Sequence, residues 1–221
     1  MVGVTREMRV LSVNVGSPRR VQVDGRVVLT SIFKTPVYGR VAVRNYNLEG
    51  DRQSDLRVHG GPYKAVYLYP SEHYDYWAEE LPGADLPFGA FGENLTTAGL
   101  DEESAHIGDR FRIGSVVLQV TQPRMPCFKL ALRFNRADMV QRFWNSGRSG
   151  IYFSISREGE LGSGDTIERL AADPEEVSVA DVVRLYKGDT SDGALIARAL
   201  RAPLSGSWKQ EIRSRRAEAI Y

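Results

Sequence analysis

Most of the chain consists of short runs of β-branched and aliphatic residues that end at glycine or proline. Such runs predict β-strands over residues 8–15, 21–23, 26–33, 40–46, 65–69, 110–113, 116–121, 151–155 and 166–170. Asp24-Gly25 separates two of these runs, and an Asp-Gly pair predicts a tight hairpin because both turn positions favour positive φ. Helical segments are predicted over residues 72–81 and 136–144. The pattern therefore predicts a mainly β fold, a barrel or a sandwich, with inserted helices.

The pattern changes after about Ala172, where an acidic segment with one proline follows. Ser178 and Asp181 match a capping box, and apolar residues follow at helical spacing up to Gly188. Residues 193–200 and 207–219 predict two more helices. We therefore expect a β domain over residues 1–172 and a three-helix module over residues 173–221.

The composition limits the possible functions. The 221 residues include 29 basic and 28 acidic side chains, and a net charge of +1 argues against a broad nucleic-acid-binding surface. A single cysteine excludes an intramolecular disulfide. No run reaches the ~18 apolar residues of a membrane span, and no secretory signal is visible at the N-terminus. We therefore expect a cytoplasmic protein that does not bind membranes.

The cysteine, Cys127, follows a predicted strand and lies in the segment QPRMPCFK of residues 122–129. Neighbouring prolines restrict the backbone, so the thiol is held on a stiff turn. Arg124 and Lys129 favour the thiolate, which is a soft metal ligand or a nucleophile. The same residue is equally consistent with a small buried hydrophobic side chain.

A second candidate is the segment RVHGGPYK of residues 57–64, in which two glycines allow the backbone to approach a ligand closely. Turns of this kind can bind anions through amide N–H groups, and Arg57 and Lys64 add positive charge. The alternative is an ordinary surface turn with solvated bases.

Two further segments carry polar groups at predicted strand ends. The glycine-rich residues 88–100 include Asn94, Thr96 and Thr97, which can hydrogen-bond a heterocycle, although a plain loop between strands explains them as well. Lys34 at the end of another predicted strand can meet an anion, or can simply be solvated.

Taken together, the chain resembles the MOSC family (molybdenum cofactor sulfurase C-terminal-like), and specifically its stand-alone YiiM-type members. The matching segments, in order, are IFKTPV at residues 32–37, LEGDRQSDLRVHGG at 48–61, KAVYLYPSEHYDYW at 64–77, FGENLTT at 91–97 and VTQPRMPCFKL at 120–130. VADVVRLYKGD at residues 179–189 resembles the three-helix module of such proteins. The resemblance implies a closed, largely antiparallel β-barrel with a molybdenum cofactor, Mo-molybdopterin, in a basic cleft.

The resemblance also implies an activity, the reduction of N-hydroxylated compounds such as hydroxylaminopurines and hydroxylamines to amines. Cys127 matches the metal ligand of the family. For the phosphate and the pterin oxygens we expect basic contacts from Lys34, Arg52, Arg57, Lys64 and Arg124. Thr35 and Asn94 are expected to hydrogen-bond the pterin. We expect His59 to donate a proton, because its charge changes near neutral pH.

The electrons must come from elsewhere. One cysteine cannot hold a four-cysteine iron–sulfur cluster, and the chain shows no dinucleotide-binding fingerprint, so we expect a separate reductase, a flavoprotein. The helical module is a candidate surface for docking that reductase or for forming a homodimer. Two alternatives use the same residues, namely a non-enzymatic carrier of the cofactor or of sulfur, and a thiol-based redox sensor without metal.

Overall fold

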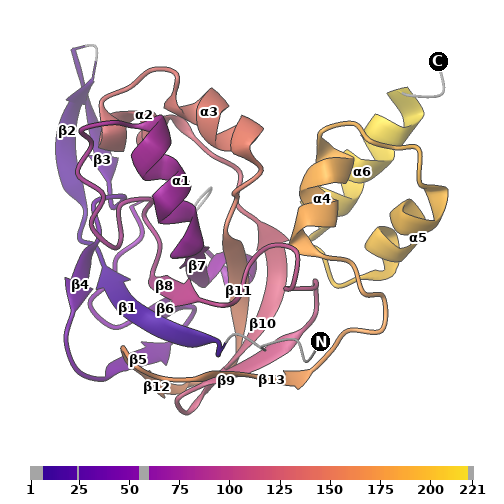
Figure 1. The fold of residues 1–221 in the computed structure, drawn as a ribbon, viewed down its shortest axis with the longest axis horizontal. Coiled ribbons are helices and arrows are strands. Elements are labelled where there is room, and N and C mark those ends of the chain that lie inside the picture. The colour runs from indigo at the N-terminus through magenta and orange to yellow at the C-terminus, as the bar shows by residue number, and fades with distance from the viewer. Residues whose placement is uncertain (1–6, 24, 55–59, 219–221) are drawn as a thin grey trace.

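The computed structural model describes residues 7–23, 25–54 and 60–218. The strands are β1 (Arg9–Val15), β2 (Arg19–Val23), β3 (Arg26–Thr30), β4 (Thr35–Val37), β5 (Val41–Arg44), β6 (Asn47–Leu48), β7 (Val66–Pro70), β8 (Leu95–Ala98), β9 (Arg110–Ile113), β10 (Val116–Pro123), β11 (Ile151–Arg157), β12 (Gly159–Leu161) and β13 (Ile167–Ala171). The helices are η1 (Pro62–Lys64), α1 (Glu72–Glu80), α2 (Phe128–Phe134), α3 (Met139–Ser146), α4 (Val179–Tyr186), α5 (Gly193–Arg201) and α6 (Gly206–Glu218). These elements form a sheet-dominated body with two groups of helices (Figure 1).

The main sheet has eight strands in the order β13-β9-β10-β11-β7-β8-β1-β4. Its β7–β8 pair is parallel and the other pairs are antiparallel, so the sheet is mixed. A smaller sheet, β12-β5-β6, and the β2–β3 hairpin complete the strands of the described residues. The hairpin turn at Gly25 has φ +75°, as the Asp-Gly pair predicts.

The expected closed barrel is found only in part, because the hydrogen-bonded ladder is open between β13 and β4. The sheet nevertheless curls so that the start of β1 lies beside the start of β13. An isolated bridge pairs Arg9 with Thr166, and the amide of Ile167 donates to the carbonyl oxygen of Met8 at 2.8 Å. A single bridged residue pair does not make a strand ladder. The remaining edge of β1 pairs with β4.

The α-helix α2 was missing from the sequence-based prediction. Helix α2 follows Cys127 directly and is only seven residues long, so its hydrophobic period is too short to recognise. The predicted capping box is confirmed, since the Ser178 hydroxyl accepts from the amide of Asp181 at 2.9 Å. Gly188 has φ +99°, the conformation expected just after a helix end.

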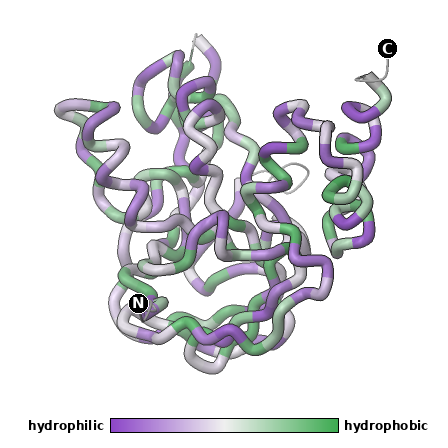
Figure 2. The backbone as a smooth tube through the Cα atoms, turned by 45° about the vertical axis from the view of Figure 1, so that its right-hand side comes forward, coloured by the Kyte–Doolittle hydropathy of each residue, from purple (hydrophilic) through white to green (hydrophobic). Residues whose placement is uncertain are grey.

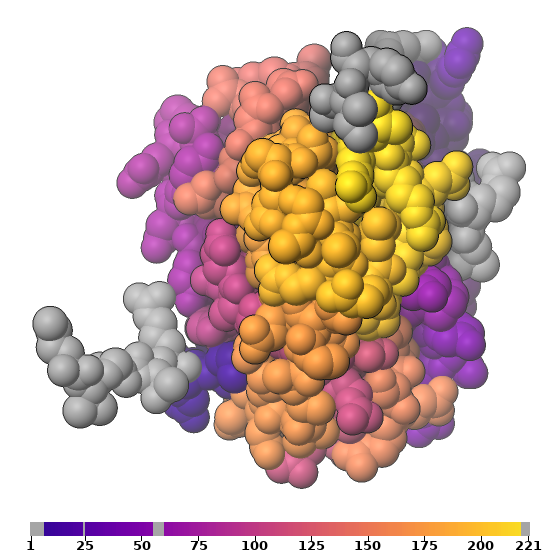
Figure 3. All heavy atoms as spheres, turned by 90° about the vertical axis from the view of Figure 1, so that its right-hand side faces the viewer, coloured from indigo at the N-terminus to yellow at the C-terminus, as the bar shows by residue number. Residues whose placement is uncertain are grey.

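The three-helix module, α4 to α6, shares one hydrophobic core with the β domain. Val179, Val182 and Leu185 of α4 belong to the same buried cluster as Leu118 and Phe153 of the sheet. Figure 3 shows the module, in orange and yellow, covering one face of the β domain. Apolar and polar residues alternate along its helices in Figure 2, as amphipathic packing requires.

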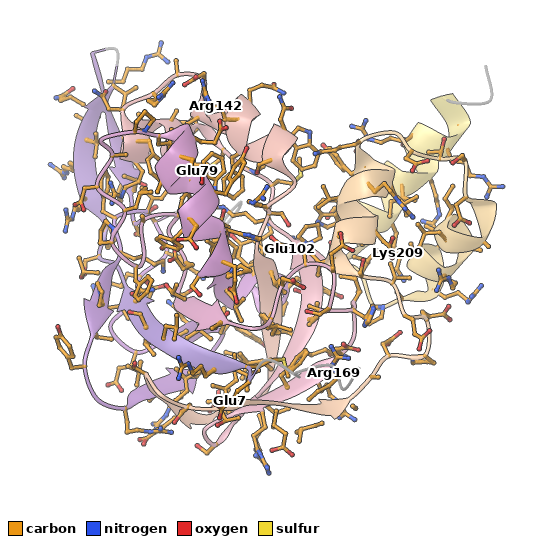
Figure 4. All side chains as sticks on the ribbon, in the orientation of Figure 1. Glu7, Glu79, Glu102, Arg142, Arg169 and Lys209 are labelled. Atoms are coloured by element: carbon orange, nitrogen blue, oxygen red, sulfur yellow. The ribbon has the colours of Figure 1, made fainter. Side chains whose placement is uncertain are left out.

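Glu102, labelled in Figure 4, joins three elements where the module meets the β domain. Its carboxylate lies 2.7 Å from Nε2 of His73 on α1 and accepts from the amide of Gly150, before β11, at 2.6 Å. Its backbone carbonyl accepts from the amide of Ala180 on α4 at 2.9 Å. The position of the module is therefore fixed by polar contacts as well as by the core. None of the helices in the described ranges combines the length and hydrophobicity that crossing a bilayer requires.

Candidate functional site

A cavity brings together segments that are far apart in the sequence. Its lining comprises Ser31, Ile32, Lys34, Asp51, Arg52, Gln53, Ser54, Gly60, Lys64, Tyr67, Gly92, Asn94, Arg124, Cys127, Lys129 and Tyr152. The predicted residues Lys34, Arg52, Lys64, Asn94, Arg124 and Cys127 are all among them. The inner part of the cavity measures about 90 Å³, and the cavity opens to the surface, so a ligand larger than phosphate would extend beyond it.

Cys127 lies between the end of β10 and the start of α2. Its backbone is extended, with φ −133° and ψ 169°, and its carbonyl accepts from the amide of Leu130 at 2.9 Å. The side chain is partly exposed, so the thiol is accessible from the cavity. Lys64 lines the same cavity, and its positive charge interacts with Cys127. The thiol and a basic side chain therefore line the same cavity.

Arg124 is held by aromatic rings rather than by carboxylates. Its guanidinium carbon lies 4.8 Å from the centre of the Tyr67 ring and 5.6 Å from that of Phe143, and it donates to the carbonyl oxygen of Phe91. The side chain is buried, and no carboxylate of the described residues forms an ion pair with it. Arg124 therefore contributes a positive charge that no acidic side chain of the described part neutralises.

Lys129 and Ser31 are two further polar residues of the cavity wall. Lys129 is buried, and its Nζ donates to the Ser54 hydroxyl at 3.3 Å, with no ion pair to a carboxylate in the described ranges. The Ser31 hydroxyl is buried and has no hydrogen-bond partner among the described residues. Burying a cation without a counter-charge is unfavourable, so these groups fit an anionic ligand.

Lys34, in contrast, is paired. Its Nζ lies 2.6 and 2.7 Å from the two carboxylate oxygens of Asp51. Asp51 also accepts from the amide of Gly16 at 2.7 Å and from Nδ2 of Asn94 at 3.1 Å. Burial lowers the pKa of Lys34, and the Asp51 charge opposes this shift. The sequence analysis missed Asp51, although the carboxylate lies in the quoted segment LEGDRQ next to Arg52.

The Asn94 side chain is engaged with the protein rather than aimed freely at a ligand. Its carbonyl oxygen accepts from the amide of Tyr67 at 3.1 Å, while its amide nitrogen donates to Asp51. Thr35 is exposed on β4 and does not line the cavity. Arg57 and His59 lie outside the described residues, so their predicted roles stay predictions.

Two lining tyrosines, Tyr67 and Tyr152, were missed, and Lys129 was named only as a base that favours the thiolate and not as a cofactor contact. The Tyr67 and Tyr152 rings lie 5.0 Å apart, and burial raises the pKa of both phenols, so they stay neutral at physiological pH. Lys129 lies two residues after Cys127, so its proximity to the thiol can be recognised from the sequence. Nothing in the local pattern separates a cavity tyrosine from a core tyrosine.

The described residues of the cavity offer too few metal-ligating side chains for a bare metal ion. In the described part of the chain, no group of three or more His, Cys, Asp or Glu side chains is placed to bind a metal. A metal at Cys127 therefore needs most of its ligands from another molecule.

Comparison with known proteins agrees with this picture. The MOSC domain model matches residues 55–168, and the model of the YiiM-like 3-alpha helix domain matches residues 177–219. The chain is 44% identical to YflK of Bacillus subtilis over 201 residues, covering 90% of each protein. It is 38% identical to YiiM of Escherichia coli over 190 residues, covering 85% of this chain and 84% of that protein.

The chain is also similar to a solved structure and to one further protein. The crystal structure of YiiM from Geobacillus stearothermophilus superposes with a TM-score of 0.78 at 34% identity, covering 95% of this chain and 99% of that one. A protein of Gibberella moniliformis named Reductase is 33% identical over 198 residues, which are 88% of this chain and 35% of that protein. The chain therefore belongs to the MOSC domain family. Within that family it is of the YiiM type, with a three-helix domain after the MOSC domain.

Proposed function

We propose that this protein binds Mo-molybdopterin in the cavity at Cys127 and reduces N-hydroxylated compounds to amines. One observation carries the proposal, namely an accessible thiol in a cavity lined by five basic side chains and one carboxylate. MOSC family membership supports a role related to the molybdenum cofactor. The relative named Reductase supports an oxidoreductase.

The residues fit the cofactor by their chemistry. Cys127 would bind the molybdenum, because a thiolate suits a soft metal centre. Arg52, Lys64, Arg124 and Lys129 would hold the anionic phosphate, because the one cavity carboxylate already neutralises Lys34. The Ser31 hydroxyl would gain a hydrogen-bond partner that the described residues do not supply. Thr35 is not assigned to the cofactor, because it lies outside the cavity lining.

When bound, the cofactor supplies the two electrons that, with two protons, convert an N–OH group into an amine and water. The protein residues orient the reactants and control the surroundings. Tyr67 and Tyr152 remain neutral because burial raises the pKa of each, so they restrict water without adding charge. Arg124 and Lys64 place positive charge near the thiol. His59 remains our proposed proton donor.

The electrons would come from a separate reductase, which we propose to be a flavoprotein. The single cysteine leaves no ligands for a four-cysteine iron–sulfur cluster in this chain. Elemental analysis and pterin extraction, followed by turnover of 6-N-hydroxylaminopurine with an artificial small-molecule reductant, test the proposal. Near-stoichiometric molybdenum and the appearance of adenine are the expected results. Molybdenum-loaded protein without turnover would instead favour a cofactor carrier, and metal-free protein from a cofactor-producing host would contradict the binding site itself.

A further inference from the structure

A second cavity adjoins the first and lies where the β domain meets the three-helix module. The two cavities share three lining residues: Lys64, Cys127 and Tyr152. The remaining walls include Gln122 and Met125 of the β domain, and Tyr186, Trp208 and Glu211 of helices α4 and α6. It encloses about 350 Å³, within the range of roughly 300–1,000 Å³ for small-molecule pockets.

We propose that this second cavity is the substrate pocket and that helix α6 supplies its specificity. The occupant would be a planar heteroaromatic compound with an N–OH group and ring-edge N–H donors, such as a hydroxylaminopurine. Trp208 would contact its ring and Glu211 would accept its N–H groups. This proposal rests on the proposed function, because it assigns Cys127, in the shared wall, to the reacting centre.

The aromatic wall is held in place by its neighbours. The Tyr186 and Trp208 rings lie 5.2 Å apart, and Tyr186 also contacts Trp144 at 5.1 Å. The guanidinium carbon of Arg215 lies 4.2 Å from the centre of the Tyr186 ring. Rings fixed in this way lose little freedom on binding, and they favour a flat ring over a flexible aliphatic chain. Met125 is 39% exposed and adds an adaptable apolar surface.

The pocket carries polar groups that can pair with a ligand. Gln122 lines it, and its amide is not one of the buried groups of the described residues that lack a hydrogen-bond partner. Arg215 reaches Glu211 only at Oε1, through Nε at 3.1 Å and a terminal nitrogen at 3.0 Å. Oε2 accepts no hydrogen bond from the described residues. A side-chain amide donates and accepts and a carboxylate oxygen accepts, so these groups suit a ligand with donors and acceptors on its edge.

The test uses the molybdenum-loaded protein and three measurements. Calorimetry with adenine, the amine product, reports binding without turnover. Steady-state kinetics compare 6-N-hydroxylaminopurine with hydroxylamine, which has no ring. Molybdenum content reports the cofactor. The variants are Glu211→Gln and Trp208→Phe, and the control is Glu175→Gln. Glu175 also pairs with an arginine, Arg201, at 2.6 and 2.7 Å, but it does not line the cavity.

We expect Glu211→Gln to weaken adenine binding and to raise KM for 6-N-hydroxylaminopurine by roughly tenfold, as for the loss of a hydrogen bond to a charged group. The KM for hydroxylamine and the molybdenum content should match the wild-type protein, as should every measurement on Glu175→Gln. Unchanged adenine affinity in both pocket variants would overturn the proposal. Loss of molybdenum in Glu211→Gln would overturn it too, because the cavity would then hold the cofactor. If no N-hydroxylated compound is reduced but Glu211→Gln still weakens adenine binding, the proposed function fails and the pocket assignment stands.

Discussion

Lys34 and Asp51 form a buried ion pair in the wall of the cavity, with side chains that are 9% and 2% exposed. The pair joins the loop before β4 to the segment after β6, and Asn94 holds the aspartate from a third direction at 3.1 Å. Because Asp51 neutralises Lys34, the charge available to an anionic ligand comes from the other cavity cations. Lys34 is therefore a less suitable direct contact for an anionic ligand than the sequence-based prediction assumed.

Asp51→Asn should destabilise the fold by about 3–5 kcal/mol, because it leaves the Lys34 ammonium buried without a counter-charge. The double variant Lys34→Met with Asp51→Asn should recover part of this loss, since no buried charge remains. Urea unfolding of the wild-type protein and the two variants measures both effects. A loss below about 1 kcal/mol in Asp51→Asn would show that water replaces the pair at little cost.

Cys127→Ser should abolish reduction of N-hydroxylated compounds and lower the molybdenum content, because serine oxygen is a harder and far less acidic donor than a thiolate. The change in volume is small and Cys127 is partly exposed, so the free energy of unfolding should fall by no more than ~0.5–3 kcal/mol. Circular dichroism separates a folded inactive variant from an unfolded one. Full activity in this variant would refute the metal-ligand assignment.

Lys129→Met should lower cofactor retention without destabilising the cofactor-free protein. Lys129 is buried with only the Ser54 hydroxyl as acceptor among the described residues, so an apolar side chain of similar length removes a desolvation cost. The measurements are molybdenum content after gel filtration and thermal unfolding of the cofactor-free form. Lys209→Met on α6, labelled in Figure 4, is the control for removing one positive charge. Unchanged molybdenum content, or a marked drop in stability, would make Lys129 a structural residue.

The free energy of unfolding should depend on pH through the titration of Glu93, and Glu93→Gln should remove this dependence. The carboxyl is buried, and burial raises its pKa above the ordinary value of 4.5, although bonds from Tyr74, Gly89 and Thr96 oppose the shift. A raised pKa in the folded state means that protonation stabilises the fold. The resulting stability is present in full below pH 4.5 and is lost as the pH rises through the folded-state pKa.

The difference in unfolding free energy between wild type and Glu93→Gln should therefore move in favour of the wild type as the pH falls from 8 to about 5. Urea unfolding at several pH values measures this difference, in which the other titrating groups cancel. A pH-independent difference would show that Glu93 keeps an ordinary pKa.

Truncation after Ala172 should leave a protein that unfolds at a lower temperature or aggregates. The sequence pattern predicts a separate β domain over residues 1–172, and such a domain would fold without the helices. The structure gives a reason for the opposite outcome, since Val179, Val182 and Leu185 complete the core of the β domain. Soluble yield and thermal unfolding of the truncated chain decide the matter. A sharp transition near the wild-type temperature would show that the module is an independent domain.

Several parts of the fold could be predicted from the sequence because they depend on neighbouring residues. The Asp-Gly hairpin and the Ser178–Asp181 capping box follow from backbone preferences over two to four residues, and both are found. Helix α2 could not be predicted in this way. It is held by tertiary packing of Leu130 against Phe143 and its aromatic neighbours, which no seven-residue pattern reveals.

For the site, the sequence by itself determined the chemistry: one cysteine, its basic neighbours and the family they resemble. Only the tertiary structure decided the geometry. It paired Asp51 with Lys34 and buried Lys129 without a carboxylate partner in the described ranges. It also placed Trp208 and Glu211 in the wall of a cavity that Cys127 lines. These contacts join residues that are distant in sequence. They are settled by how the whole chain packs its apolar faces, and local propensity carries no information about which distant side chains will share a cavity.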